Sequence, residues 1–234
     1  MSFLLSDIGV ALSDPSLAFP AALTFKVAIV TFGLHFILGL SLGWALAKPK
    51  WWGRTALDII VTVPLVFPPL ALGFVLLLLL GRRSLVGGWL DANFGFSFVF
   101  STEGVILASV IAGLPLVVKP IEAAIASLSR SLGEASRTLG RSEWETFIHV
   151  IVPNIRGAIV AGLVLGTARA LGEVGITLML GGNIVGKTNT MSLEIYNAVF
   201  NGEYPRAMAL SAILGALSVI VFIILRRSSK PVLT

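Results

Sequence analysis

Long apolar stretches separated by short polar segments are the dominant pattern in this chain of 234 residues. A helix needs about 20 mostly apolar residues to cross the hydrocarbon core of a bilayer, and five stretches reach that length. We therefore predict an all-α, polytopic membrane protein that forms a single domain over residues 1–234. The five predicted transmembrane helices are residues 22–47, 56–80, 104–127, 157–180 and 207–225.

Composition supports this class of protein and narrows its chemistry. Hydrophobic residues make up 56% of the chain and charged residues 12%, with a mean hydropathy of +0.95, whereas about a quarter of the residues in a soluble domain are charged. The lack of cysteine excludes disulfides and Cys-ligated metal sites, and two histidines are too few for a His-rich site. We expect no metal and no other cofactor. The first 20 residues contain no Lys or Arg, so we expect them to remain in the mature chain.

Basic residues are distributed unevenly between the two sides that five spans create. Eleven Lys and Arg residues fall on one side and four on the other. Because cytoplasmic loops carry the excess of Lys and Arg, we predict that the N-terminus lies outside and the C-terminus in the cytoplasm. The net charge of +5 then follows from topology, without a nucleic-acid partner. The eleven cytoplasmic residues are Lys48, Lys50, Arg54, Lys119, Arg130, Arg137, Arg141, Arg156, Arg226, Arg227 and Lys230, and the four outer ones are Arg82, Arg83, Lys187 and Arg206.

Prolines interrupt two of the predicted spans. Pro115 and Pro120 make the third span the weakest, and we expect them to break its cytoplasmic end because proline disrupts a helix interior. Pro64, Pro68 and Pro69 should kink or break the second span, which is tolerated only where protein or a water-filled cavity covers the freed carbonyls. The second span is therefore a candidate wall of a water-filled pathway. A passive kink that shapes packing explains these prolines equally well.

The cytoplasmic segment between the third and fourth spans has the local sequence of two short helices. Ser131 with Glu134, and Ser142 with Glu145, fit the S-x-x-E capping box, in which Ser and Glu satisfy free amides at a helix N-terminus. We call residues 131–153 the coupling loop, and we expect a rigid helix-turn-helix there that contacts a cytoplasmic partner. An amphipathic loop lying on the bilayer surface is the alternative.

Three further features of this loop shape the prediction. Gly140 is placed to end the first helix as a left-handed C-cap, and Pro153 should limit the second because the residue before proline avoids the α region. In the second helix an apolar stripe follows the i, i+3, i+4, i+7 pattern. Its members are Trp144, Phe147, Ile148 and Ile151.

A spaced motif runs through the same loop. Gly140 lies six positions after the start of Glu134-Ala135-Ser136, and Val150-x-Val152-Pro153 ends thirteen positions after that glycine. The motif resembles the EAA loop of bacterial ABC-importer permeases, in which Glu-Ala-Ala, three residues, Gly and nine residues precede Ile-x-Leu-Pro. Here Ser136 replaces the second alanine, and two valines replace Ile and Leu. These changes are small and leave the signature intact.

Other segments extend the resemblance over nearly the whole chain. They are Pro64 to Pro69, Gly81-Arg82-Arg83, Ala168 to Gly175, and Gly182-Asn183-Ile184 through Ile195-Tyr196. Within the superfamily the chain is most similar to molybdate permease subunits, although sulfate and tungstate permeases share the Arg-x-x-x-Glu region. The substrate therefore stays open between these oxyanions.

The resemblance implies partners and a mechanism. Such permeases form a dimer of membrane subunits in the bacterial inner membrane, with two cytoplasmic ATPase subunits and an extracytoplasmic oxyanion-binding protein. The ATPases move the EAA helices, and the spans switch between inward-open and outward-open states, so this chain itself would not be an enzyme. The residues expected to couple to the ATPase are Glu134, Ala135, Ser136, Gly140, Trp144 and Pro153.

One sequence competes with this interpretation. Residues 181–188 read Gly-Gly-Asn-Ile-Val-Gly-Lys-Thr and satisfy the P-loop pattern G-x-x-x-x-G-K-[ST]. A P-loop follows a β-strand and opens a helix that holds phosphate, whereas this match follows a predicted membrane helix and lies outside. We interpret it as a chance match.

Charged and small residues within the fourth span suggest two roles. Arg169 and Glu173 are one turn apart and can pair on one face. They either join this helix to its neighbours or, with Pro68 and Pro69, line an oxyanion pathway in which Glu173 partly masks the arginine. A transporter whose separate binding protein supplies the affinity needs no tight internal site, so packing is the favoured interpretation. Glycines 162 and 166 have G-x-x-x-G spacing, which we expect to serve packing within the subunit.

Two other classes of protein remain as alternatives. An ion-coupled secondary anion transporter would need its own coupling site and often carries internal repeats, and the sequence shows no repeat. A membrane-embedded enzyme would need a nucleophile or a metal cluster, and none is evident. Retention of a separate ATPase on purification distinguishes an importer permease from both.

Overall fold

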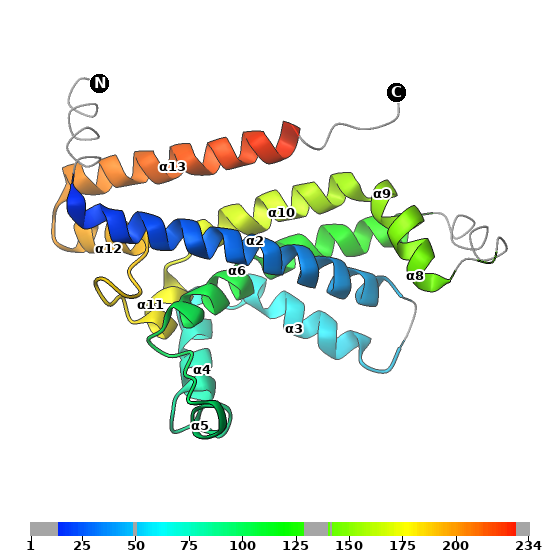
Figure 1. Cartoon of the computed structure of the whole chain (residues 1–234), viewed down its shortest axis with the longest axis horizontal. Helices are drawn as coiled ribbons and strands as arrows, with labels where there is room; N and C mark the ends of the chain where they lie inside the picture. The colour runs from blue at the N-terminus through cyan, green and yellow to red at the C-terminus, as the bar shows by residue number, and fades with distance from the viewer. Residues whose placement is uncertain (1–13, 49–50, 129–139, 141, 228–234) are drawn as a thin grey trace.

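A computed structural model describes most of the chain as a bundle of helices. Within the described residues no β-strand occurs, and the all-α prediction is confirmed. Four long helices run side by side along the longest axis of the molecule (Figure 1). They are α2 (Ala18–Ala47), α6 (Thr102–Ser127), α10 (Arg156–Leu171) and α13 (Tyr204–Arg227). The described residues are 14–48, 51–128, 140 and 142–227.

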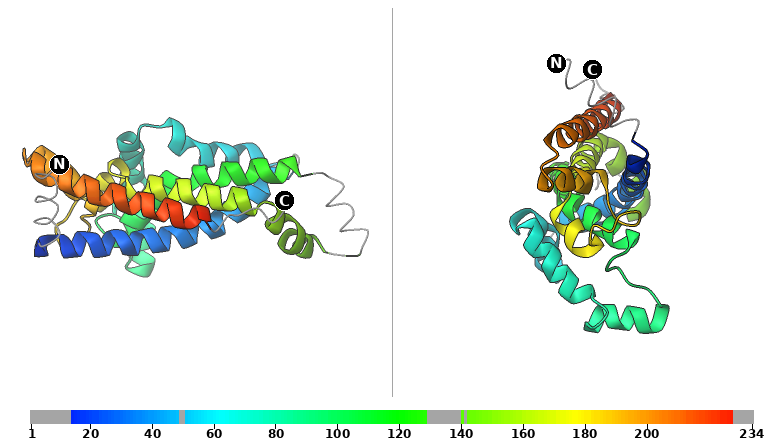
Figure 2. Two further views of the ribbon diagram at one scale, coloured as in Figure 1. Left: turned by 90° about the horizontal axis from the view of Figure 1, so that it is seen from above. Right: turned by 90° about the vertical axis from the view of Figure 1, so that its left-hand side faces the viewer.

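Shorter elements connect the long helices and cluster at the two ends of the bundle. One end carries α8 and α9, the other carries α11 and α12, and α4 extends away from the bundle with α5 across its tip (Figures 1 and 2). The shorter elements are the 3-10 helix η1 (Pro15–Leu17), α3 (Arg54–Val66), α4 (Pro69–Leu80), α5 (Leu85–Phe94), α8 (Glu143–Thr146), the π-helix η2 (Phe147–Ile151), α9 (Val152–Asn154), α11 (Gly175–Gly181) and α12 (Met191–Phe200).

Helix length and hydropathy agree with a membrane protein. Three helical stretches in the described residues are long and apolar enough to cross a bilayer by themselves: Pro15–Ala47, Thr102–Ser127 and Tyr204–Ile223. Two bent pairs of helices would raise the number to five if each pair counts as one span. They are Pro69–Leu80 with Leu85–Phe94, bent by 51°, and Glu143–Asn154 with Arg156–Leu171, bent by 74°. The first, third and fifth predicted spans are therefore confirmed as single helices, and the second and fourth are not.

Helix α6 is the centre of the bundle. Of its most apolar 18 residues 61% are buried, whereas the share is 28% in the stretch that contains α2 and 22% in α13. Glycines bring its neighbours close: a Cβ at Gly39 or Gly43 of α2 would lie 2.5 or 2.6 Å from side chains of α6, and one at Gly166 of α10 would lie 3.0 Å from the Gly113 carbonyl oxygen of α6. Small residues at a helix interface allow backbones to approach in this way. The glycines at 162 and 166 thus pack within the chain, as predicted.

The prediction that prolines break the third span is wrong. Helix α6 continues through Pro115 and Pro120 without interruption. A proline inside a helix costs about 3 kcal/mol, and this local cost is outweighed because α2 and α10 cover α6 on both sides. His35 of α2 is fully buried there, with its Nε2 atom 3.0 Å from the Val110 carbonyl oxygen of α6. Contacts that are distant in sequence therefore decide the form of α6.

The second and fourth predicted spans are each broken into two helices. The second breaks where prolines predict it, because Phe67 and Pro68 are extended, with ψ of 137° and 129°. The fourth breaks although it contains no proline: α10 ends at Leu171 and α11 begins at Gly175. A continuous fourth helix was the expectation, and the reason for the break is a buried cap described below.

Candidate functional site

The part of the coupling loop that the structure describes begins with a complete capping box. The Ser142 hydroxyl accepts a hydrogen bond from the Glu145 amide at 3.2 Å, and the Glu145 carboxylate accepts one from the Ser142 amide at 2.8 Å. Gly140 has a left-handed φ of +78° and is exposed. The second predicted helix therefore starts as the sequence indicates. The first capping box and the residues Glu134, Ala135 and Ser136 lie outside the described residues.

The predicted end of this helix at Pro153 is wrong. Val152, directly before the proline, has helical φ and ψ of −54° and −46°, and the helical path continues to Asn154. The reason is the π-helix η2, in which the Val152 amide donates to the Phe147 carbonyl oxygen. Pro153 then stands in the first turn of α9, where the fixed φ of proline fits the helical path. We call residues 143–154, from α8 through α9, the coupling segment.

The apolar stripe of the segment is only partly buried. Phe147 is 5% exposed, but Trp144 and Ile148 are 60% and 41% exposed. The four residues of the predicted stripe therefore do not form one buried face, and only part of that prediction holds.

Aromatic rings attach the segment to the end of α2. The Trp44 ring lies 4.7 Å from the Phe147 ring and 6.3 Å from the Trp144 ring, and these last two are 5.7 Å apart. Lys48 Nζ sits 4.0 Å from the Trp44 ring centroid and 3.4 Å from Glu143 Oε2. The sequence interpretation missed Trp44, which reads as one more apolar residue of a span. A Trp near the end of an apolar span was the available signal, but it ordinarily indicates a lipid-interface anchor.

The two broken spans meet each other at the start of α4. A Cβ at Gly175, the first residue of α11, would lie 3.0 Å from the Pro69 Cβ and 3.0 Å from the Leu70 amide nitrogen. A Cβ at Gly73 of α4 would lie 2.9 Å from the Ile176 Cα. Glycine is required where helices come this close. The structure therefore brings the start of α4, next to Pro68 and Pro69, against the start of α11, two residues after Glu173.

Glu173 closes the break between α10 and α11. Its side chain is 1% exposed and accepts a hydrogen bond from the Ile176 amide at 2.7 Å, which caps α11. Arg169 Nη1 lies 2.5 Å from Glu173 Oε2, and the Ser192 hydroxyl donates to the Glu173 carbonyl oxygen at 3.1 Å. These contacts support the packing role for the pair. The Arg169 side chain remains 35% exposed, so it also presents positive charge at the surface of the chain.

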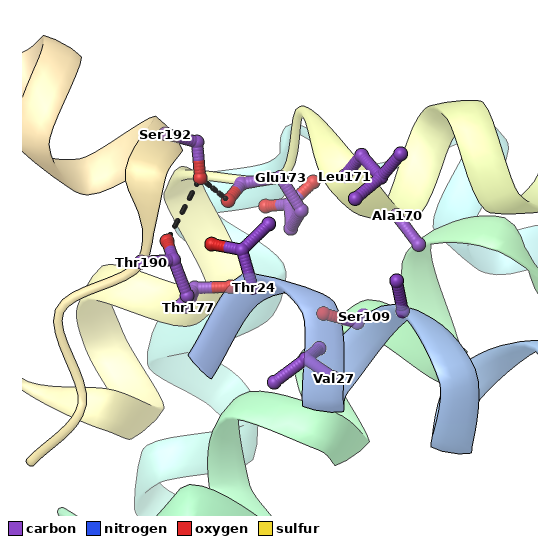
Figure 3. Close-up of a pocket in the computed structure, with 10 residues that line it drawn as sticks. Thr24, Val27, Ser109, Ala170, Leu171, Glu173, Thr177, Thr190 and Ser192 are labelled. Atoms are coloured by element: carbon purple, nitrogen blue, oxygen red, sulfur yellow. Dashed lines mark hydrogen bonds between the residues drawn. The ribbon is translucent and has the colours of Figure 1, made fainter. Parts of the chain in front are cut away.

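A small cavity lies beside this cap. It measures about 10 Å³, and hydroxyl side chains from four segments converge on it (Figure 3). That volume is on the order of one water molecule, so the cavity is too small for a tetrahedral oxyanion. Its polar lining residues are Thr24, Ser109, Glu173, Thr177, Thr190 and Ser192.

Lys26 of α2 is a cation that the sequence interpretation missed. Its side chain is exposed, beside the exposed Phe25 and Ile29, and it forms no ion pair within the described part of the chain. A cation in a membrane helix is unfavourable unless it reaches the headgroups or a polar pathway. It lies inside the first predicted span and escapes a count of basic residues in loops. A search for charges inside spans would have found it.

The P-loop match does not have the structure of a P-loop. A helix, α11, precedes it, and the next helix starts only at Met191. The Thr188 hydroxyl donates to the Gly181 carbonyl oxygen at 2.7 Å and accepts from the Ile184 amide at 2.8 Å, so it is buried in holding its own loop. This geometry supports a chance match. Within the described residues no group of three or more His, Cys, Asp or Glu side chains is placed to hold a metal ion.

Several bacterial proteins are similar to this chain over most of its length. The family described as binding-protein-dependent transport system inner membrane component matches residues 36–233. The molybdenum transport system permease protein ModB of Haemophilus influenzae is 36% identical over 76% of this chain and 77% of its own length. The putative molybdenum transport system permease protein YvgM of Bacillus subtilis is 34% identical over 81% and 84%. The sulfate transport system permease protein CysW of Synechocystis is 29% identical over 92% and 77%.

Solved structures share the fold. A chain of a bacterial alginate ABC transporter, solved with an alginate-bound periplasmic protein, superposes with a TM-score of 0.77 at 17% identity, covering 94% of this chain and 82% of that chain. A chain of the inward-facing MetNI methionine ABC transporter gives a TM-score of 0.68 at 18% identity, covering 92% and 97%. Sequence and fold agree, and the chain belongs to the binding-protein-dependent transport system inner membrane component family, the permeases of ABC importers.

Proposed function

We propose that this chain is the membrane subunit of an ATP-driven importer that carries molybdate. The observation that carries the proposal is the identity of about a third with molybdenum permeases over more than three quarters of the chain. Molybdate is a tetrahedral dianion, and sulfate has the same charge and shape. Sulfate is the second candidate, because a sulfate permease matches this chain over 92% of its length.

The proposed assembly contains two copies of this chain as a homodimer, two separate ATPase subunits and an extracytoplasmic binding protein. The N-terminus lies outside and the C-terminus in the cytoplasm, as the distribution of Lys and Arg indicates. The coupling loop then faces the ATPases. ATP hydrolysis belongs to those subunits, and the charged and broken part of the bundle, with Pro68, Pro69, Arg169 and Glu173, belongs to the translocation pathway.

The mechanism is rigid-body switching between two states. The ATPases approach each other when they bind ATP and move the coupling loop, and the loop moves the helices to which it is attached. Arg169 offers an anion a partly masked positive charge, so the pathway guides the substrate without holding it tightly. Selectivity between oxyanions rests mainly with the binding protein.

Co-purification and competition test this proposal. Expressed together, this chain should retain the ATPase, and the complex should take up radiolabelled molybdate, with unlabelled tungstate and sulfate as competitors. Gly140→Pro should uncouple hydrolysis from uptake, because proline cannot adopt the φ of +78° found there; Glu134→Lys should do the same by altering the ATPase contact. Normal coupling in both variants would show that the loop is an amphipathic surface loop and not the contact with the ATPase. Preferential uptake of sulfate would show that the chain is a sulfate permease.

A further inference from the structure

The coupling segment is joined to the bundle at two places that lie at its two ends. At its C-terminal end, Ile151 and Val152 pack with Ile155 against the buried cluster of α6 and α10. There the chain turns by 74° into α10. At its N-terminal end the segment reaches α2 through the rings of Trp144 and Phe147. The segment is thus a short arm that leaves α10 at a bend and touches a different membrane helix.

The contact with α2 combines three interactions at one point. The Trp44 and Phe147 rings, at 4.7 Å, are within the range of favourable aromatic pairs. The Lys48 ammonium stands over the Trp44 ring, and a cation over an aromatic face is attracted to it. The same ammonium pairs with Glu143 at the start of the segment. Apolar and ionic contacts therefore hold the same two elements together.

Phe147, which lies at this contact, is also the first residue of the π-helix. In a regular α-helix one face would carry the whole apolar stripe, whereas here Phe147 is buried and Ile148 is exposed. Isolated π-turns are rare and are frequently found at functional sites. This one begins at the residue whose ring contacts Trp44.

Helix α2 in turn is firmly attached to the centre of the bundle. Gly43 directly precedes Trp44 and Gly39 lies five residues before it, and a Cβ at either would collide with Val117 or Ile121 of α6. Because α2 and α6 pack this closely next to Trp44, we expect a displacement of the end of α2 to act on α6 as well.

From this geometry we infer that Trp44 and Phe147 are positioning residues that make the coupling segment and α2 move as one body, so that the motion of the ATPase reaches α2 and α6 as well as α10. The inference rests on the proposed function and adds a second route of transmission to it. Trp144 shares the contact, but its side chain is 60% exposed, which leaves most of it available to the partner subunit.

A reconstituted complex of this chain with its ATPase and binding protein tests the inference through the amount of oxyanion imported per ATP hydrolysed. Trp44→Ala should retain the ATPase and hydrolyse ATP, yet import at least fivefold less per ATP. Trp44→Phe, which keeps a ring at the contact, should stay within twofold of the wild type. Trp52→Ala is the matched control, because Trp52 lies near the same end of α2 and is fully exposed, at 104%. It should behave as wild type.

The exposed ion pair of Lys48 and Glu143 gives a second test, which does not require the removal of a buried ring. Lys48→Glu and Glu143→Lys should each lower import per ATP, and the two together should restore most of it, because the ion pair is re-formed with its charges exchanged. The natural chain has no cysteine, so a Lys48→Cys/Glu143→Cys double variant can be joined with a short thiol-specific cross-linker. If the two elements move as one body, the cross-linked complex should still transport.

The outcomes separate the inference from the proposed function. If the wild-type chain retains no ATPase, the proposed function fails. If the wild-type complex imports with ATP, and Trp44→Ala imports equally well per ATP or the cross-link abolishes transport, the inference alone is overturned. An equal loss in Trp52→Ala would overturn it too, because the effect would then not belong to the contact.

Discussion

At two helix N-termini in this molecule a glutamate carboxylate accepts a hydrogen bond from a backbone amide, once at the surface and once in a buried position. At the coupling segment, the Glu145 carboxylate accepts a hydrogen bond from the Ser142 amide at 2.8 Å in an exposed position. Inside the bundle, the Glu173 carboxylate accepts one from the Ile176 amide at 2.7 Å in a position with 1% exposure. Water can replace the first acceptor but not the second. A buried polar group that loses its partner costs far more than an exposed one, so the inner cap should serve stability and the outer one local order.

The two caps also differ in where their partners come from. Ser142 and Glu145 belong to one turn, so four consecutive residues specify the whole motif. Glu173 is held by Arg169 of α10, caps α11 and receives a bond from Ser192 of α12. The inner break is therefore a tertiary feature. This difference explains why the outer cap could be predicted and the inner break could not.

Removing the inner cap should have the largest effect. Glu173→Ala leaves the Ile176 amide and Arg169 without their acceptor, and we expect a loss of about 3 kcal/mol in the free energy of unfolding. Glu173→Gln keeps an acceptor for the amide and should lose less. Unfolding of the detergent-purified chain by a denaturant measures both. A loss below about 0.5 kcal/mol in Glu173→Ala would show that the break is held by something else.

The contact between the two broken spans should come next. Gly175→Val places a Cβ 3.0 Å from the Pro69 Cβ and the Leu70 amide nitrogen, and overpacking of this kind costs about 1–3 kcal/mol. Gly157→Val in α10 is the matched control, because a Cβ there meets nothing within 4 Å. The same unfolding measurement applies. Equal stability of the two variants would contradict the close contact between α4 and α11.

The outer cap should have a smaller and local effect. Ser142→Ala removes the acceptor for the Glu145 amide, and loss of an N-cap costs about 1 kcal/mol. Hydrogen exchange should accelerate in the amides of α8 and leave those of α11 unchanged. Ser142→Thr keeps the cap and serves as the control. Faster exchange that spread into the bundle would show that the outer cap supports the whole fold.

The exposed ion pair of the segment should contribute least to stability. Lys48 and Glu143 are 45% and 62% exposed, and pairs of this kind contribute about 0.2–1 kcal/mol. Lys48→Met should therefore change the free energy of unfolding by about 0.5 kcal/mol or less. The difference should shrink further at high salt. A larger change that did not depend on salt would assign the stabilisation to the Lys48 ammonium over the Trp44 ring, because Met keeps an apolar stem there.

Local signals predicted the elements whose causes are local. Five apolar stretches, the break at Pro68 and the capping box of Ser142 with Glu145 follow from composition, from the missing amide of proline and from three-residue spacing. Local signals did not predict the elements whose form depends on contacts with other helices. Helix α6 stays intact through two prolines because it is packed on both sides, and α10 ends without a proline because Glu173 finds its partners on other helices.

The candidate site divides in the same way. The EAA-like motif and the paired Arg169 and Glu173 are visible in sequence because their members lie a few residues apart. The aromatic contact joins Trp44 to Phe147, about a hundred positions later, and no periodicity links the two. The meeting of Pro69 with Gly175 is equally distant. Pairs of this kind can be predicted only once the arrangement of the helices is known.

The central claim is that ATP hydrolysed by a separate subunit drives oxyanion import through this chain. The most direct measurement is uptake of radiolabelled molybdate into proteoliposomes that contain the chain, its ATPase and its binding protein, with ionophores that collapse ion gradients. The account predicts uptake that requires ATP and the binding protein and persists without a gradient. Uptake by the chain alone, without ATPase and in proportion to an ion gradient, would contradict it.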